Sequence, residues 1–229
     1  MKKILLLSAI IMAAATLTFA GTNGVKSLQG GKGINNGFYL NLGFAFPTMV
    51  VKSNGFSSSA QSLGFQPNLE IGNQWYFTKN EKMGFGIKIS WLQLGYSSYK
   101  VSGYGNLYSN NSTNVDLRLI KVAPQFTLGL NDDMALDFTV EVSPTLMVGG
   151  NTESGYNYLY SAAGVLFAPG ARFRVKKFAV GVDFGFGSLA YNESRDHQVY
   201  YNGYSSTEHV NSSGRASIFS PRIYVGFKF

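Results

Sequence analysis

The sequence predicts an all-β chain that closes into an eight-stranded antiparallel transmembrane β-barrel. Apolar residues alternate with small or polar ones over eight segments, and long and short connections alternate between those segments. The chain also carries 18 Phe, 14 Tyr and 27 Gly, while only 14% of its residues are charged. A soluble domain usually carries about 25% charged residues, so the composition also favours a membrane barrel.

The N-terminus has the pattern of an export signal. Lys2 and Lys3 precede an apolar run over residues 4–15, and small residues precede Gly21. A cationic start, an apolar centre and a small-residue cleavage site are typical of a signal peptide. No later apolar stretch approaches the length of a membrane-spanning helix, and cysteine is absent. We therefore expect a signal peptide (1–20), a flexible periplasmic tail (21–36) and a barrel domain (37–229).

Residues 134–148 show the alternation most clearly, with Leu136 and Phe138 on one face and Asp137 and Glu141 on the other. A strand separates these two sets, whereas a helix would mix them. A soluble β-sandwich or lipocalin-like barrel also alternates, but its polar face would be rich in Lys, Glu and Asp. Here that face is mostly small residues, which suit a narrow lumen. The predicted strands are 38–46, 65–77, 83–94, 120–130, 134–148, 165–175, 178–188 and 219–229.

The fourth of these segments is irregular, because Leu117 and Leu119 have the opposite parity to Ile120 and Val122. A β-bulge near Leu119 would account for the switch, as would a strand that rises above the membrane before it enters lipid.

The connections define the topology. Four long extracellular loops on one side and three short periplasmic turns on the other are typical of an eight-stranded barrel with both termini in the periplasm. The predicted loops are 47–64, 95–114, 149–164 and 190–214, and the predicted turns are 78–82, 131–133 and 176–177.

The last strand ends in phenylalanine, with apolar residues at alternate positions: Ile223, Val225, Phe227 and Phe229. This pattern resembles the C-terminal signal by which the barrel assembly machinery recognises its substrates. With the signal peptide and eight strands, the chain resembles the small bacterial outer-membrane β-barrel family of the OmpA transmembrane-domain and OmpX type. The resemblance implies a place in the outer membrane of a Gram-negative bacterium, in contact with lipopolysaccharide. It implies little chemistry, because the family is functionally broad.

The predicted inward faces carry charges of both signs. A buried unpaired charge costs several kcal/mol, so these charges should pair. We expect an ion-pair network that plugs the lumen and fixes the strand register, and no large pore, since eight strands leave an interior filled by side chains. The residues of this network are Glu70, Lys88, Lys121, Asp137, Glu141, Arg172, Arg174, Asp183 and Arg222.

The predicted loops are rich in Tyr set among Ser, Gly and Asn, a composition typical of adaptable recognition surfaces. An equally weighted interpretation is that these tyrosines extend the outer aromatic belt and contact lipopolysaccharide. The tyrosines expected to contribute are Tyr104, Tyr108, Tyr158, Tyr160, Tyr200, Tyr201 and Tyr204.

His197 and His209 both fall in the fourth loop, near Asp196 and Glu208, at a spacing that matches no lipid A hydrolase or acyltransferase motif. We therefore expect no catalytic residue, cofactor or metal. The net charge of +7 is scattered without a basic run, so nucleic acid is not an expected partner. We expect a non-enzymatic barrel with a structural envelope role or an adhesin-like role, whose loops contact an extracellular protein or glycan. The alternatives are a lipid A-modifying enzyme and a small channel or hydrophobic-ligand conduit.

Overall fold

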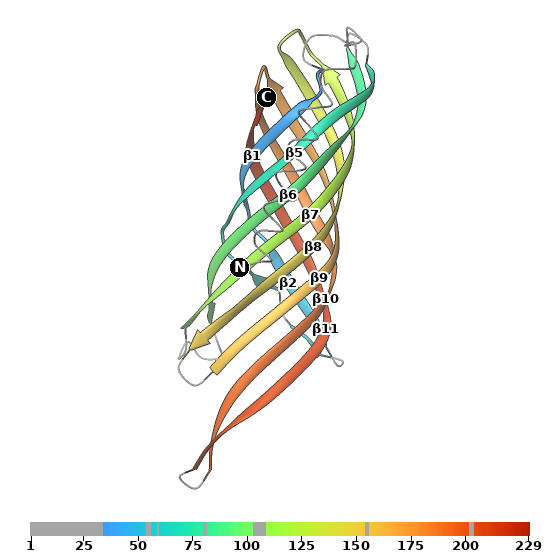
Figure 1. Cartoon of the computed structure of the whole chain (residues 1–229). Coiled ribbons are helices and arrows are strands. Elements are labelled where there is room, and N and C mark those ends of the chain that lie inside the picture. The colour runs from blue at the N-terminus through green and yellow to red at the C-terminus, as the bar shows by residue number, and fades with distance from the viewer. Residues whose placement is uncertain are drawn as a thin grey trace, which may run out of the picture. The chain divides into compact units, whose positions relative to one another are not determined.

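The computed structural model describes residues 34–53, 56–58, 60–79, 82–102, 109–153, 156–201 and 204–229 (Figure 1). The predicted signal peptide, and the predicted tail as far as residue 33, lie outside these residues. The described part contains β1 (Gly37–Ala45), β2 (Thr48–Ser53), β3 (Phe56–Ser57), β4 (Gln61–Ser62), β5 (Gln66–Lys79), β6 (Met83–Ser102), β7 (Ser109–Gly129), β8 (Met134–Glu153), β9 (Tyr156–Val175), β10 (Phe178–Tyr201) and β11 (Tyr204–Lys228). Among the described residues, no helix has the length and apolar character needed to cross a membrane.

Eight strands form a closed antiparallel ring. Strands β5 to β11 pair in chain order, β1 pairs with β5, and β1 also pairs with β11 to close the ring. β2 continues the pairing of β1 along β11, and β3 and β4 pair with β2. The predicted eight-stranded antiparallel barrel is therefore confirmed. Closure matters because lipid cannot hydrogen-bond to an open strand edge.

The outside of the ring is apolar, and the largest exposed side chains include Phe77, Phe85, Phe178 and Phe229. This apolar belt consists of the exposed apolar residues on the outward faces of the ring strands. On the extracellular side it ends near Phe186 on β10 and Phe219 on β11. An exposed apolar surface that encircles the chain is typical of contact with lipid rather than water.

The last residues of the predicted tail contact the barrel. Ile34 is fully buried, the side-chain amide of Gln74 donates to the Asn35 carbonyl at 3.2 Å, and the Tyr76 backbone N–H donates to Asn36 Oδ1 at 2.8 Å. Residues 34–36 therefore pack with the barrel.

The irregular predicted strand contains a bulge in β7. The register of β7 against β8 shifts between Arg118 and Val122, and Ile120 has a φ of 53°. The prediction of a bulge near Leu119 is confirmed. The bulge lets Leu119 and Ile120 both face outward, so that Arg118 and Lys121 on either side of them both face the lumen.

Three of the four long connections differ from irregular loops, because most of their residues continue the strands as paired hairpins. Above the membrane the outward face of a strand contacts water instead of lipid, so the outward apolar residues that mark a strand in lipid are lost. The apolar alternation in the sequence therefore ends before the strands do. The last paired positions are Ser102 with Ser109, Glu153 with Tyr156, and Tyr201 with Tyr204.

Tyrosine rings inside the barrel lie across glycines of the neighbouring strand. Tyr224 is the cross-strand partner of Gly181, and Tyr160 is the partner of Gly149. A Cβ at Gly149 would lie 2.6 Å from the Tyr160 ring, which leaves no room for a side chain, and a Cβ at Gly181 would meet Tyr224 equally closely. Glycine at these inward positions is thus required by close approach of an aromatic ring.

We predict that Gly181→Ala lowers the free energy of unfolding by about 1–3 kcal/mol, because the added methyl group displaces the Tyr224 ring. The matched control is Gly185→Ala on the same face of β10, where the nearest atom to an added Cβ is 3.3 Å away and the effect should stay below about 1 kcal/mol. Urea unfolding in lipid vesicles measures both values. Equal losses for the two variants would contradict the role given to the ring.

Candidate functional site

Six buried charged side chains from six different strands meet inside the barrel. Glu141 bridges the ammonium groups of Lys88 and Lys121, each at 2.6 Å. Glu70 lies 3.1 Å from Lys88 and 2.7 Å from the Arg222 guanidinium, which also pairs with Asp183. Three cations thus balance three anions, as a buried set requires. We call this set, Glu70, Lys88, Lys121, Glu141, Asp183 and Arg222, the central charge cluster.

A second cluster lies nearer the periplasmic turns. The Asp137 carboxylate accepts hydrogen bonds from Arg172 at 2.8 Å and from Arg174 at 2.7 Å. It also accepts one from the Thr127 hydroxyl at 2.6 Å, and Arg172 donates to Gln74 Oε1 at 2.6 Å. All nine charged residues predicted for the lumen are therefore buried and lie in these two clusters.

The sequence interpretation missed a third ion pair. Asp116 and Arg118 are both buried, and their side chains are 2.8 Å apart. Their inward direction follows from the bulge, which shifts the alternation of β7 so that Leu117 and Leu119 face outward. The opposite parity of these two leucines in the sequence is the signal that could have located the ion pair.

The extracellular part of the lumen holds a cluster of apolar and aromatic side chains, which the sequence interpretation also missed. Met49 comes from β2 and Leu63 follows β4, so the first connection folds over the interior rather than away from it. Both side chains are almost completely buried. We call this set the upper plug; it comprises Met49, Leu63, Tyr99, Met147, Tyr160, Ala162, Leu166, Leu189, Tyr191, Ala216 and Ile218.

Two of the tyrosines predicted for recognition belong to this interior. Tyr160 is 1% exposed, its ring stacks on Tyr191 at 5.7 Å, and its hydroxyl donates to Asn114 Oδ1 at 2.9 Å. The Tyr158 and Tyr191 hydroxyls are 2.6 Å apart, and Tyr191 donates to Glu193 at 2.7 Å. Burial raises the pKa of Tyr158 to about 12 and also raises the pKa values of Tyr160 and Tyr191.

These contacts change the recognition prediction for Tyr158 and Tyr160. Inward-facing rings whose hydroxyls are already bonded pack the barrel, so they offer little surface to an extracellular partner. Tyr200, Tyr201 and Tyr204 lie at the paired end of the β10–β11 hairpin, and Tyr104 and Tyr108 lie outside the described residues.

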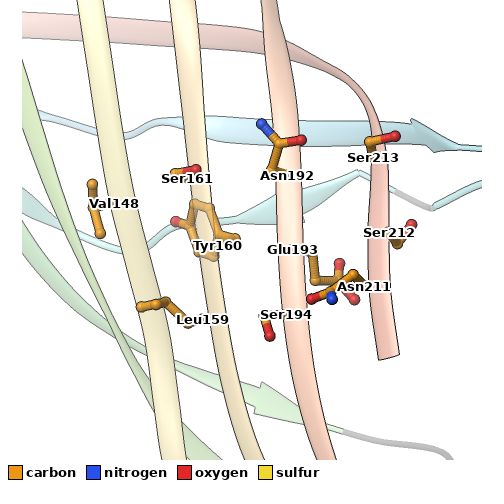
Figure 2. A pocket seen from close by; sticks show the side chains of 10 residues that line it. All are labelled: Val148, Leu159, Tyr160, Ser161, Asn192, Glu193, Ser194, Asn211, Ser212 and Ser213. Carbon is orange, nitrogen blue, oxygen red and sulfur yellow. The ribbon is translucent and has the colours of Figure 1, made fainter. Parts of the chain in front are cut away.

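A groove on the outer wall crosses β8 to β11 (Figure 2). Its volume is about 390 Å³, and most of its lining side chains alternate outward, with only Tyr160, Glu193 and Ser212 on inward positions. We call it the outer-wall groove. The lining residues are Val148, Leu159, Tyr160, Ser161, Asn192, Glu193, Ser194, Asn211, Ser212 and Ser213.

The two predicted loop histidines lie on the β10–β11 hairpin. His209 Nδ1 is 2.6 Å from Asp196 Oδ1, and both side chains point away from the barrel interior. The backbone of His197 pairs with Glu208. Among the described residues, no group of three or more His, Asp and Glu side chains could hold a metal ion.

The residues of the predicted assembly signal lie where the ring closes. Ile223 and Val225 are exposed in the apolar belt on β11, next to β1. The Phe227 ring contacts Phe178 at 5.2 Å and Phe229 at 4.8 Å.

We predict that Glu141→Gln lowers the free energy of unfolding by about 3–5 kcal/mol. The substitution removes the carboxylate that bridges Lys88 and Lys121, so these two buried ammonium groups have one partner carboxylate fewer. The control is Asp133→Asn, which removes an exposed pair with Lys176 at 3.8 Å and should cost less than about 1 kcal/mol. Urea unfolding of both variants in lipid vesicles is the measurement. A loss for Glu141→Gln as small as that of the control would show that the central charge cluster does not stabilise the barrel.

No family model and no curated protein matches this chain by sequence. Among solved structures, the chain is similar to the outer membrane protease OmpT from Escherichia coli, at 8% identity and a TM-score of 0.48, over 89% of this chain and 99% of that one. It is also similar to Ail of Yersinia pestis in complex with the heparin analogue sucrose octasulfate, at 9% identity and a TM-score of 0.40, over 84% of this chain and 99% of that one. A third is the outer membrane protein OprG from Pseudomonas aeruginosa, at 12% identity and a TM-score of 0.41, over 89% and 99% of the two chains.

The membrane assignment rests on the burial pattern of the chain itself. A closed antiparallel ring encloses paired charges and presents an apolar belt outward. This arrangement is that of an outer-membrane β-barrel, the localisation predicted from the sequence.

Proposed function

We propose that this chain is a non-enzymatic outer-membrane barrel of a Gram-negative bacterium that presents its extracellular hairpins, above all β10–β11, for recognition at the cell surface. The observation that carries the proposal is the length of that hairpin. β10 leaves the apolar belt at Phe186 and remains paired with β11 as far as Tyr201. At roughly 3.3 Å per residue, this is about 50 Å of strand beyond the membrane.

The filled lumen supports a role outside it. The two charge clusters and the upper plug place side chains from most of the ring strands across the interior. An aqueous channel would need a continuous polar path, and a side-chain-filled eight-stranded barrel leaves little space for one. The surface beyond the membrane is therefore the better candidate for function.

The hairpin is also built as a paired element rather than a loose loop. Arg195 pairs with Glu193 on β10, and Asp196 contacts His209 across the two strands. Figure 1 shows β10 and β11 reaching beyond the ends of β8 and β9. A preformed hairpin loses less conformational entropy on binding than a flexible loop of equal length.

We predict that shortening the hairpin removes surface binding without removing the fold. The variant deletes residues 196–209 and joins Arg195 to Val210, a cross-strand pair, through an Asn-Gly turn. Bacteria that display either form are tested for adhesion to a panel of immobilised glycans and extracellular-matrix proteins. We expect equal amounts of heat-modifiable folded barrel, and adhesion for the full-length chain alone. Equal adhesion of both forms, or a shortened chain that no longer folds, would contradict the proposal.

A second candidate function is modification of lipid A, favoured by the contact between His209 and Asp196. A carboxylate that holds one imidazole nitrogen is the arrangement that orients a general base, and Ser194 lies two residues from Asp196 on the same outward face.

Mass spectra of lipid A from cells with and without the chain distinguish the two functions. Under our proposal the spectra are identical. A mass change that corresponds to one acyl chain, and that disappears in the His209→Gln variant, would instead establish the enzyme.

A further inference from the structure

On β10 and β11 the outer-wall groove lies past the extracellular end of the apolar belt, and on β8 and β9 it borders the belt residues Val148 and Leu159. Asn192 is six residues past Phe186 on β10, and Ser213 is six residues past Phe219 on β11. With a rise of about 3.3 Å per residue and a strand tilt of about 45°, these two residues lie roughly 14 Å above Phe186 and Phe219. At that height the wall faces the sugar region of an outer-leaflet glycolipid rather than its acyl chains.

The lining of the groove suits sugar hydroxyl groups. Six of the ten lining residues are Ser or Asn, contributed by β9, β10 and β11. Each hydroxyl or amide can both donate and accept hydrogen bonds, which is the versatility that a polyol requires. Leu159, which is 59% exposed, and Val148 add apolar surface at one end.

The charge in the groove argues for a neutral ligand. Glu193 is the only charged residue among the ten that line it. Its carboxylate accepts the Tyr191 hydroxyl at 2.7 Å and pairs with Arg195. A phosphate site is typically built from Arg, Lys or backbone N–H donors, and a carboxylate repels phosphate.

The floor of the groove is held from inside the barrel. The Tyr160 ring stacks on Tyr191, and the Tyr160 hydroxyl is fixed by Asn114. Little side-chain entropy remains to be lost there on binding. A volume of about 390 Å³ lies within the usual range of small-ligand sites, roughly 300–1,000 Å³.

From the position, lining, charge and rigidity of the groove, we propose that it binds neutral sugar units of a glycolipid in the outer leaflet of the membrane. The groove lies on the flank of the barrel, whereas the proposed recognition element is the tip of the β10–β11 hairpin. The two sites are therefore separable by mutation.

The test uses the full mature chain, folded in detergent, and native mass spectrometry to measure binding. Four probes are compared: lipopolysaccharide that carries core sugars, the same material after removal of its phosphates, lipid A without sugars, and the soluble core oligosaccharide. Asn192→Trp fills the groove from an exposed position, and Asn211→Trp is a second filling variant. The matched control is Ser188→Trp, which lies on the same outward face of β10 but outside the groove.

We expect the unaltered chain to bind sugar-bearing lipopolysaccharide about tenfold more tightly than lipid A, the effect of one or two hydrogen bonds. Removal of the phosphates should leave this preference unchanged. Both filling variants should lose it, and Ser188→Trp should keep it. Heat modifiability on gels verifies that each variant is folded.

Four results would overturn the proposal. Binding that does not depend on the sugars, or that survives filling of the groove, would exclude this site. Loss of the preference on dephosphorylation would assign the ligand as phosphate. Soluble oligosaccharide that binds as tightly as the intact glycolipid would assign the groove to free glycans rather than to the membrane.

Discussion

Hydrocarbon offers no hydrogen-bond partners, and in this barrel that constraint links the closed ring to the pairing of its charges. The backbone satisfies itself by closing β1 against β11, and charged side chains are kept on the lumen side, where each needs a counter-charge. Six ring strands each contribute one residue to the central charge cluster. A strand that slipped by one residue would turn its charge toward lipid, so the cluster and the register of the ring specify each other.

Above this cluster the side chains that fill the lumen are of a different kind, and this difference bears on which surfaces a partner could reach. The upper plug replaces ion pairs with methionine, leucine and tyrosine, and part of it comes from β2 and the residue after β4. The first connection therefore helps to fill the interior. The other three connections continue as paired hairpins, so the surfaces free to meet a partner are strand faces and hairpin ends.

The sequence predicted those features that depend on the alternation of inward and outward residues along a strand. The inward direction of residues such as Asp137 and Arg172, and the bulge near Leu119, follow from which residues share a face. The sequence did not predict that Glu141 would bridge Lys88 and Lys121. Which charged side chains meet across the lumen depends on the stagger of strands that are far apart in sequence. Nor did it place Tyr160 inside, since Tyr among Ser and Asn is equally typical of loops and of strand extensions above the membrane.

The outer-wall groove shows most directly why a site on a barrel wall is hard to find from sequence. Residues such as Ser161, Asn192 and Ser213 are ordinary surface residues on separate strands, and they become a site through the register that joins those strands. Tyr160 lines this groove and also packs in the upper plug. The shape of the outer surface therefore depends on the packing of the interior, and a chain with a filled lumen can use that filling to hold a binding surface rigid on its wall.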